Sequence, residues 1–438
     1  MPLLAAGGAT ERNDGNNAAA HTGGIRVVLS PSHSLPDEAG RNVELSALLH
    51  GAVHRVKSRL VHLLQTDDYT TTPSTGTQDL SSSVSGAQTV ELHEKRSAAG
   101  KPLNADKSEV RDVGEQELVT LDDIRAAKQR LLQNKLVVRT PLLREVQAMF
   151  PGVEDIRLHL KLENMQTAGS FKIRGVVNQI DHLLETQDLT DKKLVTMSAG
   201  NYGKAFAYYL QSARVSGVCV MPVTAPENRV QLIRSLGVEV ELRALPDLQV
   251  TVDKHVAEEG YVLCHSFDDL HLIAGHASCA MEVLEEGLTP DVVLVCCGGG
   301  GLVSGVAAAF HLASPKPVKV YAVEPEGANT MWESYRAGKP VSKEVKSVAS
   351  GLSPPYAGRL CYAHCKRFVE DVILVSEEEI VQAMHELFER GLKVEPAGCA
   401  AMAAILNHRV PEVEGKDVLV IVSGGNVSVQ ELYQLLPK

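Results

Sequence analysis

The sequence predicts an α/β protein with two lobes, each built on a twisted parallel sheet flanked by helices. From residue 118 onward, short β-branched runs alternate with helical patterns, as in parallel strands joined by crossover helices. This part of the chain also exceeds the roughly 300 residues at which single cores stop growing. The 438-residue chain can therefore bury sizeable cores without disulfides.

The predicted strands are LVTM (194–197), VCVM (218–221), VEVEL (238–242), VVLVCC (292–297), VKVYAVE (318–324), VILV (372–375) and VLVIV (418–422). A helical pattern follows each strand. In the pattern at 377–390, the apolar residues Ile380, Met384, Leu387 and Phe388 fall on one face. We expect a catalytic domain over 118–438, with a smaller lobe of about 163–280 inserted in the larger one.

Residues 1–117 form a separate N-terminal extension, which we expect to be largely disordered. Residues 66–116 are rich in Ser, Thr, Gly and charged residues and lack a periodic apolar pattern. Within 43–64, leucines and valines recur near helical spacing, which predicts one amphipathic helix. Packing on the main body or a partner subunit is favoured over a signalling role for this helix.

Composition limits the partners to small molecules. A formal net charge of −11 disfavours nucleic acid and membrane surfaces, which require a basic face. No apolar run approaches the roughly 18 residues of a membrane span. All eight cysteines lie in 219–399, mostly within apolar runs, as reduced thiols do. We expect a soluble cytoplasmic protein, with the mitochondrion as the alternative, although Glu11 and Asp14 argue against a transit peptide.

A run of four glycines joins the strand at 292–297 to a helix: Gly298, Gly299, Gly300 and Gly301, followed by Leu302. Without side chains, successive N–H groups can converge on an anion, and the helix N-terminus adds its positive end. A tight turn would need only one or two glycines. The loop therefore predicts an anion site, although it lacks the Walker and dinucleotide patterns that would name the ligand.

Three further motifs carry polar chemistry. In SFKIRG, Lys172 stands beside Phe171 and close to Arg174, an environment that can lower an amine pKa, although a lone lysine is usually an ordinary surface residue. In SAGNYGKA, the donors at a strand end suit a carboxylate or a ring oxygen, or simply cap a helix. Ser423 follows the strand at 418–422 and either donates to a heterocycle nitrogen or ends the strand in a turn.

Together with APENRVQLIRSLGVEV (225–240), AVEPEGANT (322–330) and KVEPAG (393–398), these motifs recur in order over residues 118–438. In that arrangement the chain resembles the fold-type II pyridoxal-phosphate enzymes, the tryptophan-synthase β-like family, and within it the threonine dehydratase and serine racemase group. Residues 1–117 have no part in the resemblance.

The resemblance implies that Lys172 carries pyridoxal 5'-phosphate covalently, with Phe171 against its ring. The phosphate would be held by Gly298, Gly299, Gly300, Gly301 and Leu302. Asn201 would bind the ring hydroxyl, Ser423 the pyridine nitrogen, and Glu395 would support the ring. A neutral serine leaves that nitrogen largely unprotonated, which favours β-elimination over transamination.

The implied activity is an L-threonine/L-serine dehydratase (ammonia-lyase) that gives 2-oxobutyrate or pyruvate plus ammonia. The freed Lys172 would remove the α-proton, and the hydroxyl would leave with a proton supplied near the cofactor phosphate. The substrate carboxylate would rest on the segment of Ser198, Ala199, Gly200, Asn201 and Tyr202. A homodimer is the family expectation, and feedback through a C-terminal regulatory domain is not expected.

Several positions depart from the family pattern. Ala199 stands where serine racemases carry a second serine, so the group that moves a proton on the opposite face is missing. Tyr202 replaces a common histidine and Ser350 a common aspartate, which leaves the choice of substrate open.

No metal is expected. Glu324 and Ala328 match two positions of the racemase-type divalent cation site, but Thr330 stands in place of the acidic ligand. The CxxHC segment of Cys361, His364 and Cys365 lacks the second cluster that a zinc site of about four ligands would need.

Alternative activities remain at this point. Serine racemase and hydroxyaspartate dehydratase belong to the same group. β-Replacement enzymes share the lysine and asparagine motifs, but their phosphate loop usually alternates Gly with Thr. A non-catalytic protein with this fold is disfavoured by the intact Lys172, Asn201, glycine run and Ser423.

Overall fold

The structure is a computed structural model that describes residues 118–435. Its larger sheet has six strands in the order β1-β2-β10-β7-β8-β9. All neighbours pair in parallel except β1 and β2. The strands are β1 (Leu142–Leu143), β2 (Arg157–Leu162), β7 (Val292–Cys296), β8 (Lys319–Pro325), β9 (Asp371–Val375) and β10 (Asp417–Val422).

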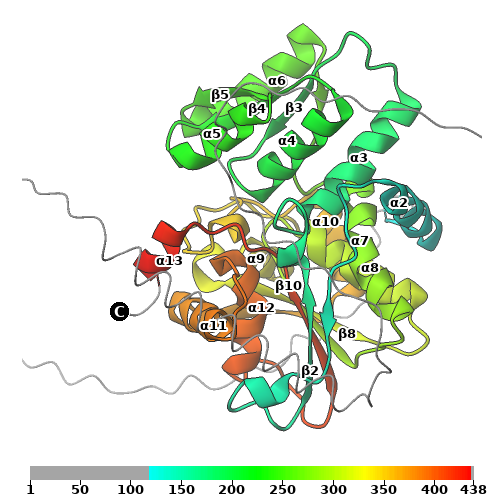
Figure 1. Cartoon of the computed structure of the whole chain (residues 1–438), viewed down its shortest axis with the longest axis vertical. Coiled ribbons are helices and arrows are strands. Elements are labelled where there is room, and N and C mark those ends of the chain that lie inside the picture. Colours follow the sequence, from blue (N-terminus) through cyan, green and yellow to red (C-terminus); the bar gives the residue numbers. More distant parts are fainter. Residues whose placement is uncertain (1–117, 436–438) are drawn as a thin grey trace, which may run out of the picture. The chain divides into compact units, whose positions relative to one another are not determined.

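The smaller sheet has four parallel strands in the order β5-β4-β3-β6. Figure 1 shows this sheet with α4, α5 and α6 apart from the larger sheet. The strands are β3 (Leu194–Met197), β4 (Gly217–Pro222), β5 (Glu239–Arg243) and β6 (Val262–Leu263); the helices are α4 (Asn201–Ala213), α5 (Glu227–Ser235) and α6 (Leu248–Glu259). These elements lie within the predicted smaller lobe.

Helices α3 and α7 link the two sheets in the chain and pack on each other, and α7 packs in turn on α8. Helix α12 lies across β10, β7, β8 and β9. The remaining bounds are α2 (Leu121–Gln133), α3 (Lys172–Thr186), α7 (Leu270–Glu285), α8 (Gly301–Ala313), α9 (Thr330–Ala337), α10 (Arg359–Phe368), α11 (Glu377–Glu389), α12 (Pro396–Leu406) and α13 (Val429–Leu435). No helix of 118–435 is long and apolar enough to cross a membrane.

The predicted α/β class and the expected strands from 194 to 422 are confirmed, as is the helix at 377–390. A capping box of Ser376 and Glu379 starts that helix as α11, because each side chain bonds the other residue's backbone N–H. The predicted helix at 43–64 and the extension of 1–117 lie outside the described residues.

Candidate active site

Lys172 is the first residue of α3 and is held at the carboxyl end of β10. Just before it, Ser170 forms a β-bridge with Gly424, and the Phe171 N–H donates to the Ser423 carbonyl oxygen at 3.1 Å. The Lys172 Nζ donates to the Ser266 carbonyl oxygen at 2.7 Å. Nζ lies 5.1 Å from the Phe171 ring centroid and 5.8 Å from that of Tyr202. The chain thus brings the predicted lysine and the predicted Ser423 together.

Burial lowers the pKa of Lys172 to about 8 from its ordinary value of 10.5. Desolvation disfavours the ammonium form, so a useful fraction of the amine is neutral near physiological pH. A neutral amine is the form that attacks a carbonyl or accepts a proton.

The rate at which cofactor-free protein reacts with pyridoxal phosphate should therefore follow a pKa near 8. Below pH 8 the rate should fall about tenfold per pH unit, because only the neutral amine reacts, and above pH 8 it should level off. Stopped-flow absorbance between pH 6 and 10 measures this. A rate that keeps rising through pH 10 would show an amine of ordinary pKa.

A buried ion network fixes the first turn of α3. The Arg174 guanidinium makes paired bonds of 2.7 and 2.8 Å to Glu163 and again to Glu282. Lys161 donates to Glu282 at 2.7 Å, and Thr140 donates to Glu163 at 2.6 Å. Both arginine-bound carboxylates and both cations are buried. The network ties α3 to β2 and α7, and so sets where Lys172 stands.

The four glycines form a close-packed turn between β7 and the N-terminus of α8. Gly300 has a φ of +102°, which favours glycine. A Cβ on Gly299 would lie 2.2 Å from the Phe267 ring, and one on Gly301 would lie 2.8 Å from the Phe267 carbonyl oxygen. Leu302, in the first turn of α8, is buried beneath the loop. The run is thus required sterically, and its N–H groups meet a helix N-terminus, as a phosphate cradle requires.

Substituting Gly299 with alanine should displace the Phe267 ring and cost about 1–3 kcal/mol of stability through overpacking. It should also weaken pyridoxal phosphate binding at least about tenfold, since 1.4 kcal/mol corresponds to a factor of ten. Gly287→Ala is the control, because its Cβ meets open space away from the loop and only its φ of +75° is strained. Equal cofactor affinity in the two variants would contradict the cradle.

Asn201, the first residue of α4, bridges the two lobes. Its Nδ2 donates to Glu395 Oε1 at 2.5 Å, and its Oδ1 accepts from Asn426 Nδ2 at 2.7 Å. Lys204 Nζ donates to Asn426 Oδ1 at 2.6 Å. Burial raises the pKa of Glu395. The predicted Asn201 and Glu395 therefore form one hydrogen-bonded unit, which Asn426 extends.

The loop before α4 offers an open surface beside this unit. The Ser198 hydroxyl accepts from the N–H groups of Gly200 and Gly203, at 3.3 and 3.1 Å, and so shapes the turn. A Cβ on Gly200 would meet nothing within 4 Å, which leaves room for a ligand group. Ala199 is partly buried on this turn. Tyr202 is instead buried, and its hydroxyl donates to Gln179 at 2.5 Å.

Ser423 sits at the end of β10 with its side chain buried. Its hydroxyl accepts from the Cys296 thiol at 3.1 Å, which leaves its own proton available. The neighbouring Ser170 hydroxyl is buried without a partner among the described residues. Buried hydroxyls rarely stay unpaired, so a bound polar group at this point fits the geometry. A buried amine, a glycine cradle and two available hydroxyls together suit pyridoxal phosphate.

Ser350 reaches the same region. It lines a cavity of about 50 Å³ together with Glu395, Asn426 and Arg229. Ser350 is exposed, so a substrate side chain can approach it. This placement is consistent with the expectation that Ser350 lies near the substrate pocket.

Glu324 has a structural role at the position of the racemase-type cation site. Its buried carboxylate accepts from the N–H groups of Met331 and Trp332, at 2.9 and 2.8 Å, and so caps α9. Burial raises the pKa of Glu324 to about 8. Ala328 is buried in the turn before α9, and Thr330 is buried as its first residue. Within 118–435, no group of three or more His, Cys, Asp or Glu side chains could hold a metal ion.

The CxxHC residues pack inside α10. The His364 Nε2 accepts from the Val119 N–H at 2.9 Å, and its Nδ1 lies 2.7 Å from the Leu360 carbonyl oxygen. The Cys361 thiol donates to the Phe267 carbonyl oxygen at 3.2 Å. His364 thus ties α10 to the residue before Thr120, and Cys361 ties it to the segment that follows β6.

Sequence reasoning missed the segment His265–Asp269, although it carries the carbonyl that holds Lys172. The segment follows β6, a strand of only two residues whose apolar run is too short to stand out. Asn426 was also missed, although it lies directly after the SGG motif. A polar residue following a strand end was the available signal in both cases.

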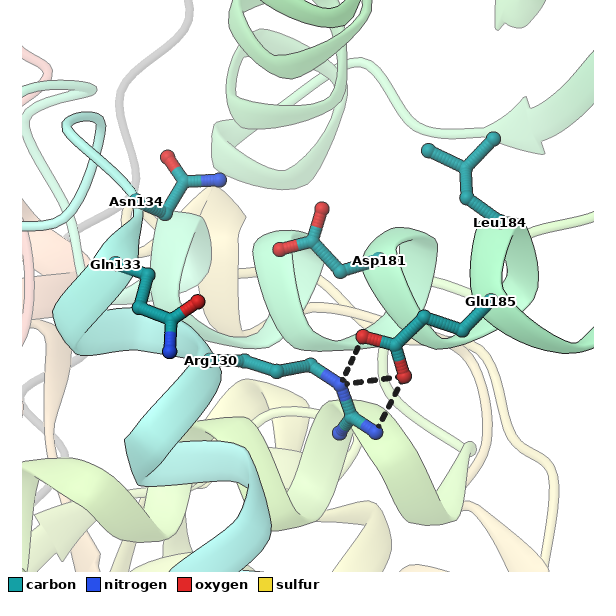
Figure 2. A pocket seen from close by; sticks show the side chains of 6 residues that line it. All are labelled: Arg130, Gln133, Asn134, Asp181, Leu184 and Glu185. Carbon is teal, nitrogen blue, oxygen red and sulfur yellow. Dashed lines mark hydrogen bonds and ion pairs between the residues drawn. The ribbon is translucent and has the colours of Figure 1, made fainter.

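A separate cavity of about 330 Å³ lies between α2 and α3, away from Lys172 (Figure 2). Its Arg130 is held by Glu185 at 2.8–3.0 Å, as the dashed lines show, so its charge is already compensated. The cavity is lined by Arg130, Gln133, Asn134, Asp181, Leu184 and Glu185. It contains no group of the site around Lys172.

The chain is similar to known proteins over most of its length. A family model described as "Pyridoxal-phosphate dependent enzyme" matches residues 110–424. This chain belongs to that family. The family's cofactor is thus pyridoxal phosphate, as the site geometry indicates, and the predicted resemblance is confirmed.

Among its relatives in the family, the L-threonine ammonia-lyase of Thermotoga maritima is 36% identical over 73% of this chain and 79% of the relative. The catabolic L-threonine dehydratase of Staphylococcus aureus is 33% identical over 71% and 90%. The solved serine racemase of Dictyostelium discoideum is 31% identical with a TM-score of 0.64, and covers 71% of this chain and 99% of its own.

Proposed function

We propose that this pyridoxal-phosphate dependent enzyme is an L-threonine/L-serine ammonia-lyase, which releases 2-oxobutyrate or pyruvate and ammonia. The observation that carries the proposal is the position of the buried Lys172 amine. It is held by the Ser266 carbonyl, next to the Phe267 ring that packs on the glycine cradle, and it follows Phe171, whose N–H bonds the Ser423 carbonyl oxygen. The named activities of the threonine relatives support it, since each covers more than two thirds of both chains.

The residues divide the work between binding and proton transfer. When bound, pyridoxal phosphate withdraws electrons from the substrate Cα, which makes the α-proton acidic. The Lys172 amine accepts that proton, since burial keeps its pKa near 8. The turn from Ser198 to Tyr202 offers N–H groups and open space at Gly200 to the substrate carboxylate. Asn201 and Ser423 orient the ring, and Glu395 fixes Asn201.

Racemisation is the second candidate, because solved serine racemases share the fold. Reversing the configuration at Cα requires an acid on the face opposite Lys172. On that face the Ser198–Tyr202 turn carries Ala199, and its methyl group cannot transfer a proton. We therefore propose that elimination dominates over racemisation.

The test is the release of 2-oxo acid from L-threonine, L-serine, D-serine and threo-3-hydroxyaspartate, with chiral analysis of the remaining serine. Turnover of L-threonine or L-serine without D-serine formation supports the proposal. Racemisation that exceeds elimination would overturn it and assign the opposite-face proton to another group. Preferred turnover of hydroxyaspartate would move the substrate class to acidic β-hydroxy amino acids.

We also propose a cytoplasmic homodimer. The eight cysteines are free, buried thiols, as expected in a reducing compartment. Sedimentation equilibrium tests the dimer, and a mass of one 47.1 kDa chain would contradict it.

A further inference from the structure

Tyr356 lies where the glycine loop and the Lys172-holding segment meet. The residues before it pack on the loop, since a Cβ on Gly298 would lie 3.0 Å from the Leu352 Cα. The residues after it bond the loop, since the Gly358 N–H donates to the Gly299 carbonyl oxygen at 3.2 Å. The Tyr356 ring itself packs on Phe267, with centroids 5.2 Å apart. The hydroxyl is thus held beside the cradle.

His265 orients that hydroxyl. The His265 Nδ1 accepts from the N–H groups of Phe267 and Asp268, at 3.3 and 2.9 Å, so its proton resides on Nε2. Nε2 lies 3.1 Å from the Tyr356 oxygen and donates to it. Because that oxygen is the acceptor, the tyrosine's own proton is directed elsewhere. The next residue, Ser266, holds the Lys172 amine through its carbonyl, so the tyrosine hydroxyl and the reacting lysine are both bonded to the segment of His265 and Ser266.

We propose that Tyr356 is the general acid that protonates the departing β-hydroxyl, with His265 as its positioning residue. The inference rests on the proposed function, because it concerns the second half of the same elimination. Tyr356 is half-buried, and burial raises its pKa, so the phenol is protonated at neutral pH, as a donor must be. Burial also lowers the pKa of His265, which keeps the imidazole neutral.

The step balances in atoms and electrons. The Lys172 amine takes the α-proton, and the electron pair of the broken Cα–H bond becomes the Cα=Cβ bond. The Cβ–O bond breaks with its pair on oxygen, the Tyr356 proton joins that oxygen, and water leaves. The tyrosinate, stabilised by the His265 N–H, then regains a proton from the Lys172 ammonium through solvent, which resets both groups.

Tyr356→Phe tests the assignment with two leaving groups. L-Serine requires a proton on its hydroxyl, whereas L-serine O-sulfate releases a stable sulfate anion without one. The variant should lose about a hundredfold in kcat for L-serine, the lower range for a general acid. Its kcat for L-serine O-sulfate should change by less than about threefold, since no protonation is removed. The aromatic ring is retained, so its packing on Phe267 remains.

The affinity for L-alanine, which has no leaving group, gives a second measurement that does not depend on turnover. The Kd of L-alanine, measured by calorimetry, should stay within about threefold of the wild-type value, because alanine has no β-oxygen. Tyr362→Phe removes a hydroxyl from α10 outside the site and should leave both substrates unchanged.

Equal losses with both substrates, an unchanged serine rate, or a tenfold weaker L-alanine Kd would each overturn the role of Tyr356. Failure of the wild-type protein to release pyruvate from L-serine would instead sink the proposed function, whatever the variant does.

Discussion

Replacing Lys172 with alanine should lower 2-oxo acid release at least about a thousandfold, because one side chain both bonds the cofactor and moves the α-proton. Among residues 118–435, Lys172 is the lysine whose amine is fixed 2.7 Å from the Ser266 carbonyl oxygen. The purified variant should also lack the visible absorbance of a lysine-bound cofactor. Steady-state kinetics and an absorbance spectrum measure both effects.

Lys204→Ala is the control for this prediction. Its amine lies in the same region but bonds Asn426 at 2.6 Å and belongs to α4. The control should keep the visible absorbance, whatever its turnover. A Lys172→Ala protein that retained the absorbance would place the covalent bond on another lysine.

Replacing Arg174 with methionine should cost about 3–5 kcal/mol of unfolding free energy, the usual effect of removing one partner from a buried ion pair. Arg174 pairs with both Glu163 and Glu282, and its removal leaves Glu282 with Lys161 and leaves Glu163 with the neutral Thr140 hydroxyl. Urea unfolding followed by circular dichroism measures the loss. Because α3 begins at Lys172, we expect weaker cofactor binding in the same variant.

Arg125→Met provides the matched comparison. Arg125 pairs with Asp122 at 3.3 Å, and their side chains are 63% and 91% exposed, so solvent screens the pair and its loss should cost less than about 1 kcal/mol. Equal losses of unfolding free energy in the two variants would show that the buried network contributes no more to stability than an exposed ion pair does.

The fold was predictable wherever a strand is uniformly apolar, as at 292–297 and 418–422. Strand β2 was missed because its sequence RLHLKL carries His159 and Lys161 at positions that are buried. Those polar side chains are tolerated because Asp417 and Glu282 pair with them, at 3.1 and 2.7 Å. Partners so distant in the chain cannot be recognised from local pattern, so the burial of β2 was not predictable from its own residues.

The predicted site residues depended on strong local motifs, and the structure brings Lys172, Asn201, Ser423 and the glycines together. The contacts among them were not predictable. That Asn201 joins Glu395 and Asn426, or that the Ser266 backbone holds the lysine, follows from the packing of two lobes. A backbone carbonyl carries no residue signature, so sequence reasoning has no means to find it. For Tyr202 the local motif was misleading. It indicated contact with the substrate, whereas the side chain is buried and its hydroxyl bonds Gln179.

The most direct test of elimination at this site measures 2-oxobutyrate and ammonia together, from L-threonine and purified protein loaded with pyridoxal phosphate. We expect the two products to form in equal amounts at a steady rate, and we expect neither product from Lys172→Ala. Cofactor-loaded protein that releases neither product, yet forms cysteine from O-acetylserine and sulfide, would contradict it and assign β-replacement to this chain.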